Sequence, residues 1–137
     1  VEENDVLATV RELGIGFVPY SPLGRGFLTG EYKSFDDLPA DDFRRRNPRF
    51  QGENFQKNLD LVREVEAIAA EKGATPAQVA LAWVMRRDGV IAIPKAGSVA
   101  HVRETRAAAY LVLSDDDLAA LDAAFPRPRA RRPLEML

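Results

Sequence analysis

The segment that most constrains the fold is residues 15–26, which read Ile-Gly-Phe-Val-Pro-Tyr-Ser-Pro-Leu-Gly-Arg-Gly. An apolar run of strand length ends at Tyr20 and passes directly into a turn that contains two glycines and an arginine. The run is almost continuously apolar rather than alternating, which is typical of a parallel strand covered on both faces. The segment therefore predicts an α/β fold with a ligand-binding type of turn at the carboxyl end of a buried strand.

The rest of the chain combines helical patterns with one further apolar run, at residues 90–94. Helices are predicted over residues 6–13, 53–72, 75–85 and 99–110, and after Ser114. The 75–78 stretch, Thr-Pro-Ala-Gln, is a capping box with proline at the first helical position. Strands that alternate with helices indicate parallel pairing. Because two such strands leave both edges of their sheet open, the order predicts the end of a larger α/β protein.

Residues 22–53 carry proline, glycine, aspartate and arginine without periodicity. A connection of this length is usually a lid, a binding loop or a disordered segment. Within it, residues 44–46 are three arginines that follow Asp41 and Asp42 closely. The expected outcome for this charge run is a solvated loop. Ion pairing or contact with an anion is the alternative.

The composition excludes several classes of protein. The 137 residues suit one small domain, and a net charge of −2 argues against a nucleic-acid surface despite the basic stretch Arg127-Pro-Arg-Ala-Arg-Arg. We expect residues 127–137 to form a flexible tail. The absence of cysteine excludes disulfides and thiolate metal sites and favours a reducing, cytoplasmic location. No apolar stretch has membrane-spanning length, and the acidic start, which begins with Val rather than Met, does not resemble a signal peptide.

Candidate binding residues follow both predicted strands. Tyr20, Ser21, Leu23, Gly24 and Arg25 come after the first, and Lys95, Ser98, His101 and Glu104 come after the second. Glycines let the backbone approach an anion, arginine and lysine add positive charge, and a helix N-terminus attracts phosphate. Each feature alone is more often a plain turn or a surface residue. Together they match the rule that the last two loops of a (β/α)8 barrel form its phosphate site.

Three motifs resemble those of the aldo-keto reductases, in that family's order and with similar spacing. They are Tyr-Ser-Pro-Leu-Gly-Arg-Gly-Phe-Leu-Thr-Gly at 20–30, Asn-Pro-Arg-Phe-Gln-Gly-Glu-Asn-Phe-Gln-Lys at 47–57, and Ile-Pro-Lys-Ala-Gly-Ser-Val-Ala-His-Val-Arg-Glu at 93–104. The second resembles the bacterial, plant and fungal branch. The resemblance implies that residues 1–126 are the C-terminal part of a (β/α)8 TIM barrel, strands seven and eight with their helices, incomplete as a barrel.

The resemblance also implies a role for each matched residue in binding NADPH. Tyr20 would stack on the nicotinamide, while Ser21, Leu23, Gly24 and Arg25 would line the pyrophosphate. Lys95 and Ser98 would hold the adenosine ribose and its 2′-phosphate, and Glu104 would bind the adenine edge or lock the loop. Two positions depart from the family pattern: His101 stands where many members have arginine, and Thr105 stands where asparagine is usual.

The resemblance further implies an absence. The family's catalytic Asp, Tyr, Lys and His lie on earlier strands, where the tyrosine donates a proton to a carbonyl. We therefore predict no catalytic residue and no metal ligand in this chain. The expected function is the cofactor-binding segment of an NADPH-dependent reductase of a small aldehyde or ketone, inactive and unstable alone, with no nucleic-acid or membrane partner. The alternative is a non-enzymatic module that binds a nucleotide or a protein. Nucleic-acid binding through the arginine-rich tail fits the net charge poorly.

Overall fold

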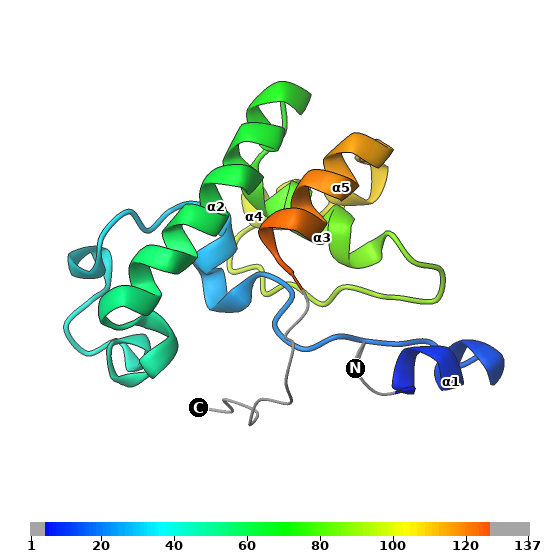
Figure 1. Cartoon of the computed structure of the whole chain (residues 1–137), viewed down its shortest axis with the longest axis horizontal. Helices are drawn as coiled ribbons and strands as arrows, with labels where there is room; N and C mark the ends of the chain where they lie inside the picture. The colour runs from blue at the N-terminus through cyan, green and yellow to red at the C-terminus, as the bar shows by residue number, and fades with distance from the viewer. Residues whose placement is uncertain (1–4, 127–137) are drawn as a thin grey trace.

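The computed structural model describes residues 5–126, and these form a mostly helical assembly (Figure 1). The five α-helices of this part of the chain are α1 Val6–Glu12, α2 Gly52–Lys72, α3 Pro76–Met85, α4 Val99–Ala107 and α5 Asp115–Ala124. Short 3-10 helices complete it: η1 Gly24–Thr29, η2 Phe35–Asp37, η3 Phe43–Arg46, η4 Pro48–Phe50 and η5 Ala108–Tyr110. The predicted basic tail at 127–137 lies outside the described residues.

One hydrophobic core holds the C-terminal helices together. Helix α3 contacts α2, α4 and η5, and α5 packs beside α2 (Figure 1). The core cluster consists of Val65, Ile68, Ala69, Val79 and Leu121. The predicted burial of α3 is confirmed for its first two turns, where Val79 is 0% exposed and Leu81 is 1% exposed, whereas residues 83–85 are half-buried. Trp83 packs at the margin of this core, as a core residue rather than a ligand platform.

The predicted helix ends are confirmed because their signals are local. Gly73 ends α2 in the left-handed conformation, with φ of 61°. In the capping box of α3, the Gln78 amide donates to Thr75 Oγ1 at 3.3 Å and the Thr75 amide donates to Gln78 Oε1 at 3.0 Å. Both capping-box contacts satisfy donors that the helix itself leaves unpaired.

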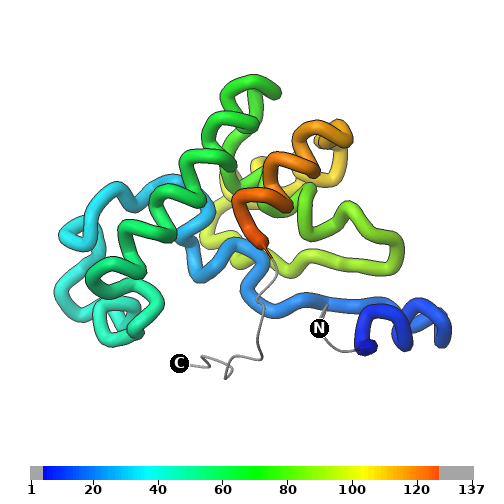
Figure 2. The backbone as a smooth tube through the Cα atoms, in the orientation of Figure 1, coloured from blue at the N-terminus to red at the C-terminus, as the bar shows by residue number. Residues whose placement is uncertain are grey.

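The two predicted strands are replaced by a single parallel bridge between Phe17 and Val90, within the described part of the chain (Figure 2). The Phe17 amide donates to Gly89 O at 2.7 Å and the Ile91 amide donates to Phe17 O at 2.9 Å. The parallel direction was predicted correctly, whereas strands over 15–20 and 90–94 were wrong. Pro19 has no N–H for the next bond of the ladder, to Ile91 O, so pairing ends there.

Residues 22–53 are more structured than the sequence predicted. Four 3-10 helices follow one another, and a second core cluster forms from Phe27, Leu38, Phe50, Phe55 and Val62. The Phe27 ring meets Phe55 edge-on, with centroids 5.1 Å apart, and lies 5.6 Å from Phe50. This segment has its own aromatic core against the first half of α2, which a search for regular periodicity does not detect.

A buried carboxylate links the end of α2 to the start of α5. Asp117 is 7% exposed, pairs with Lys72 Nζ at 2.6 Å and accepts from the Ser114 amide at 2.6 Å. The hydrogen bond from Lys72, followed by those from Ser114, holds the pKa of Asp117 below its usual value. The carboxylate therefore stabilises the fold in its ionised form.

The Asp117→Asn variant is expected to lower the free energy of unfolding by about 2 kcal/mol at pH 7, since it removes charged hydrogen bonds from a buried site. Because the folded-state pKa is lowered, the stabilisation is present above about pH 4 and is lost as the pH falls through the folded-state pKa. Urea unfolding at several pH values measures both effects. Asp115→Asn is the control, because Asp115 is an exposed aspartate in the same helical turn. Equal losses in the two variants would contradict the prediction.

Candidate functional site

A pocket of about 750 Å³ opens where the ends of the two extended segments meet α4 and the 22–53 segment. Of the predicted site residues, Tyr20, Ser21, Leu23, Arg25, Lys95, His101 and Glu104 all line it. The two loops that follow residues 15–20 and 90–94 are thus brought together, as the rule for parallel strand ends leads one to expect. Gly24 and Ser98 are predicted site residues that are not among those lining the pocket.

Four residues of the turn on one side of the pocket have left-handed backbone conformations. Ser21, Gly24, Arg25 and Gly26 have φ values of 56°, 57°, 59° and 86°. For Ser21 and Arg25 this conformation is strained, and such residues persist only where neighbouring contacts hold them. The Arg25 amide donates to Ser21 Oγ at 3.0 Å and the Gly24 amide donates to Ser21 O at 2.9 Å. Gly24 therefore shapes the turn, although it does not line the pocket.

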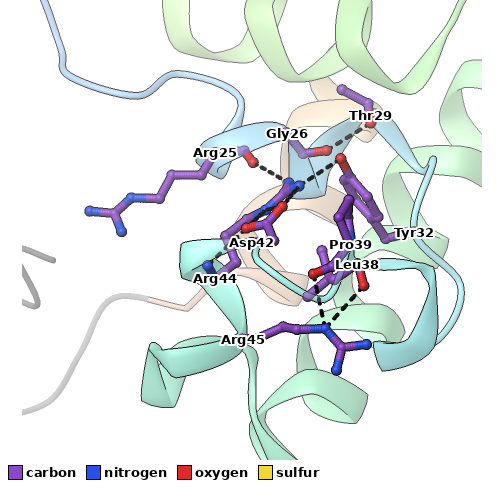
Figure 3. A network of polar contacts seen from close by, with 9 residues as sticks. All are labelled: Arg25, Gly26, Thr29, Tyr32, Leu38, Pro39, Asp42, Arg44 and Arg45. Carbon is purple, nitrogen blue, oxygen red and sulfur yellow. Dashed lines mark hydrogen bonds and ion pairs between the residues drawn. The ribbon is translucent and has the colours of Figure 1, made fainter.

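The Arg25 side chain carries an unused donor. Its guanidinium lies 5.3 Å from the centroid of the Phe43 ring, and its Nη1 is buried with no hydrogen-bond partner among the described residues. Figure 3 shows this side chain pointing away from the polar group formed by Arg44, Asp42 and Tyr32. A buried cationic donor without a partner is costly unless a ligand satisfies it, and an anionic oxygen does so best. The pocket therefore fits a phosphate-bearing ligand.

The opposite side of the pocket is formed by residues 93–95 and the first turns of α4. Ser98 caps this helix, because its Oγ accepts from the His101 amide at 3.2 Å. This cap explains why Ser98 does not line the pocket. Gln78 Nε2 donates to Glu104 O at 3.1 Å and so ties α4 to α3. Thr105, where the family pattern has asparagine, also lines the pocket.

The third side, which the sequence did not predict, is a buried polar group around Arg44 (Figure 3). Arg44 is 8% exposed and pairs with Asp42 at 2.6 Å. Its hydrogen bond holds the pKa of Asp42 below the usual value, and the same bond raises the pKa of Arg44. For Arg44 the expected solvated loop was wrong, and the alternative of ion pairing is the one observed. The local signal of this Asp42–Arg44 ion pair is the position of Asp42, which precedes Arg44 by two residues and caps η3.

Two tyrosines, a lysine and a histidine line the same pocket. Tyr20 is 80% exposed, and the Tyr32 hydroxyl accepts from Arg44 Nη2 at 2.8 Å. Among the hydrogen bonds of residues 5–126, none joins either tyrosine to Lys95 or His101.

In the described range, histidine and carboxylate side chains do not gather in threes around a possible metal position. None of the helices between residues 5 and 126 combines the length and the apolar character needed to cross a membrane.

The sequence profile described as the aldo/keto reductase family matches residues 1–125, so the chain belongs to this family and the resemblance is confirmed. An aldo-keto reductase [NADP(+)] of Schizosaccharomyces pombe is 48% identical over 114 residues, which are 82% of this chain and 34% of that protein. An aldo-keto reductase of Strobilurus tenacellus is 44% identical over 85% of this chain and 35% of its own length. A probable aldo-keto reductase of Glycine max is 39% identical over 90% and 36%. The chain thus spans about a third of the length of the curated relatives it matches.

Solved structures of the family are similar as well. The glycerol dehydrogenase of Gluconobacter oxydans matches with a TM-score of 0.77 and 29% identity over 95% of this chain and 41% of its own. A thermostable aldo-keto reductase, solved with the inhibitor epalrestat, matches with a TM-score of 0.62 and 30% identity over 90% and 34%. Aldo-keto reductases have a TIM barrel fold, and the parallel bridge with its surrounding helices agrees with a portion of one.

Proposed function

We propose that this chain provides the cofactor-binding side of an NADPH-dependent aldo-keto reductase, as the C-terminal part of that enzyme's barrel. The observation that carries the proposal is that Arg25, whose Nη1 has no hydrogen-bond partner among the described residues, lines the same pocket as Lys95. Two cations in the lining of one pocket suit a ligand with two separate phosphate groups, such as the pyrophosphate and the 2′-phosphate of NADPH. The relative named for NADP(+) supports this cofactor.

Each residue around the pocket has a proposed part in holding NADPH. Tyr20, which is largely exposed, offers its ring face to the nicotinamide. Ser21, Leu23 and Arg25 hold the pyrophosphate, with Gly24 fixing the backbone of the turn. Lys95 and His101 face the 2′-phosphate, Glu104 and Thr105 lie toward the adenosine, and Ser98 fixes the helix start beside them. When bound, NADPH supplies the hydride that reduces a carbonyl carbon.

We propose that the complete reaction reduces a small aldehyde or ketone, with the proton donated by a tyrosine from another part of the barrel. The tyrosines of this chain do not suit that role, since Tyr32 already accepts from a permanently charged arginine and Tyr20 is exposed without a lysine partner. A reductase assay of the 137-residue chain with NADPH and a simple aldehyde is therefore expected to give no turnover. Robust turnover would contradict this part of the proposal.

Calorimetric titration tests the binding role directly. The Arg25→Met variant is expected to bind NADPH about tenfold more weakly than the unmodified chain, because it removes one charged contact to the pyrophosphate. Arg49→Met is a matched control, because Arg49 is exposed and does not line the pocket. If the unmodified chain fails to bind NADPH, or if both variants lose affinity equally, the proposed site is wrong.

One observation favours a second function, the non-enzymatic nucleotide-binding module. Two hydrophobic core clusters form within residues 5–126, and a separately folding unit requires a core of its own. A single cooperative unfolding transition of the 137-residue chain, together with NADPH binding at micromolar concentration, would support the module. A non-cooperative transition would count against it.

A further inference from the structure

One guanidinium connects the later part of the 22–53 segment, at Arg44, to the turn at the start of that segment, which lines the pocket. Arg44 Nη1 donates to the carbonyl oxygen of Arg25 at 2.9 Å, and Nη2 donates to the Tyr32 hydroxyl at 2.8 Å (Figure 3). The remaining contacts are with Asp42, which accepts from Nε at 3.0 Å and from Nη2 at 2.6 Å. The guanidinium carbon also lies 4.4 Å from the centroid of the Tyr32 ring. Asp42 and Tyr32 thus hold the Arg44 guanidinium in place beside the turn.

The carbonyl that Arg44 holds belongs to Arg25, one of the two non-glycine residues of the turn with positive φ. Arg25 has φ of 59° and ψ of 36°, a left-handed conformation that is unfavourable for a residue with a side chain. Its amide is held by Ser21 Oγ and its carbonyl by Arg44, so both peptide groups around it are tied down. At the next residue, a Cβ on Gly26 would lie 3.4 Å from Arg44 Nη1, which shows how closely the guanidinium approaches the backbone.

Arg44 is in turn anchored to a packed segment rather than to a mobile loop. The second core cluster, with Phe27, Leu38 and Phe50, lies in the same segment on both sides of it in sequence. The position of the turn therefore depends on this segment through Arg44. Without that contact the strained backbone of Arg25 would relax, and the Arg25 side chain would lose its place in the pocket lining.

We propose that Arg44 is a positioning residue that holds the Ser21–Gly26 turn in the geometry needed to bind the pyrophosphate and nicotinamide half of NADPH. The proposal rests on the proposed function, since it assigns a residue that acts through the cofactor-binding turn. Arg44 also lines the pocket, but its proposed role is exerted through the turn: it holds the carbonyl of Arg25, and Arg25 meets the ligand.

Arg44→Lys is the informative substitution. Lysine keeps the positive charge for Asp42, but a compact ammonium cannot reach Asp42, Tyr32 and the Arg25 carbonyl together as the planar fork does. Arg45→Lys is a matched control one residue away. Arg45 Nε also donates to backbone carbonyls, those of Leu38 and Pro39 at 3.0 and 3.1 Å, but it makes no contact with the turn among the described hydrogen bonds.

The experiment compares two ligands by calorimetric titration of the 137-residue chain. NADPH spans the whole proposed site, whereas 2′-AMP carries the adenosine and 2′-phosphate but neither the pyrophosphate nor the nicotinamide. Arg44→Lys is expected to weaken NADPH binding about tenfold, the loss of one charged hydrogen bond, and to leave 2′-AMP binding unchanged within about twofold. Arg45→Lys is expected to change neither. A purely structural role would not alter the ratio of the two affinities.

The outcomes separate this inference from the proposed function. If the unmodified chain does not bind NADPH, the proposed function fails and the inference fails with it. If the unmodified chain binds but Arg44→Lys binds NADPH equally well, or loses both ligands in equal measure, only the inference is overturned. If Arg44→Lys does not fold, Tyr32→Phe replaces it, because it removes one acceptor of Arg44 and keeps the ring. A selective loss of NADPH affinity of about threefold in Tyr32→Phe supports the inference, and no selective loss overturns it.

Discussion

Phe50→Ala is expected to lower the free energy of unfolding by about 4 kcal/mol, the largest effect of any substitution considered for this chain. Phe50 is 1% exposed and is among the largest fully buried side chains. Its ring lies 5.6 Å from that of Phe27 in the second core cluster, so truncation leaves a cavity that neighbouring rings fill only in part. We expect the 22–53 segment to lose stability before the rest of the chain does.

Hydrogen exchange followed residue by residue measures where the stability is lost. We expect protection to fall for amides of η1, η4 and the first half of α2, and to persist in α3 and α5, which belong to the other core cluster. Phe43→Ala is the control, because Phe43 lies in the same segment but is 54% exposed. A uniform loss of protection across both clusters would show that they do not open separately.

The helices of this protein could be predicted from sequence because their determinants are close together along the chain. The Thr75 and Gln78 pair, the Ser114 and Asp117 pair, and Gly73 each act within one helical turn. The strands could not be predicted in the same way. A strand requires partners for its backbone, and here Pro19 removes the N–H that the second rung would need. Pro19 is evident in the sequence, but its effect on strand pairing depends on which residue of the other segment lies opposite it.

The candidate site likewise has one part that could be predicted from the sequence and one part that could not. That Arg25 and Lys95 share a pocket follows from a rule about parallel strand ends, which needs only the order of elements. The buried state of Arg44 does not follow from any local pattern. It depends on the Tyr32 hydroxyl and the Arg25 carbonyl, which lie 12 and 19 residues away in sequence. A run of three arginines is normally solvated, and these distant acceptors, together with the nearby Asp42, distinguish the first from the others.

Asp42→Asn is expected to destabilise the fold by about 3 kcal/mol at pH 7, because it leaves the charge of Arg44 buried without its carboxylate. The side chains of Arg44 and Asp42 are only 10% and 12% exposed, so water compensates little. Asp41→Asn is the matched control, since Asp41 is an exposed neighbour with the same charge. Urea unfolding of both variants measures the difference, and a similar loss in the two would contradict the prediction.

The pH dependence of this loss gives a second and independent check. The hydrogen bond from Arg44 holds the folded-state pKa of Asp42 below its usual value, so the carboxylate contributes its stabilisation above about pH 4. That contribution disappears as the pH falls through the folded-state pKa. The stability difference between the unmodified chain and Asp42→Asn should therefore be constant from pH 5 to pH 8 and shrink on further acidification. Asp117 titrates in the same direction but is present in both proteins, so its effect cancels in the difference. A difference that grows toward acid would mean that the carboxylate of Asp42 is not held in its ionised form by Arg44.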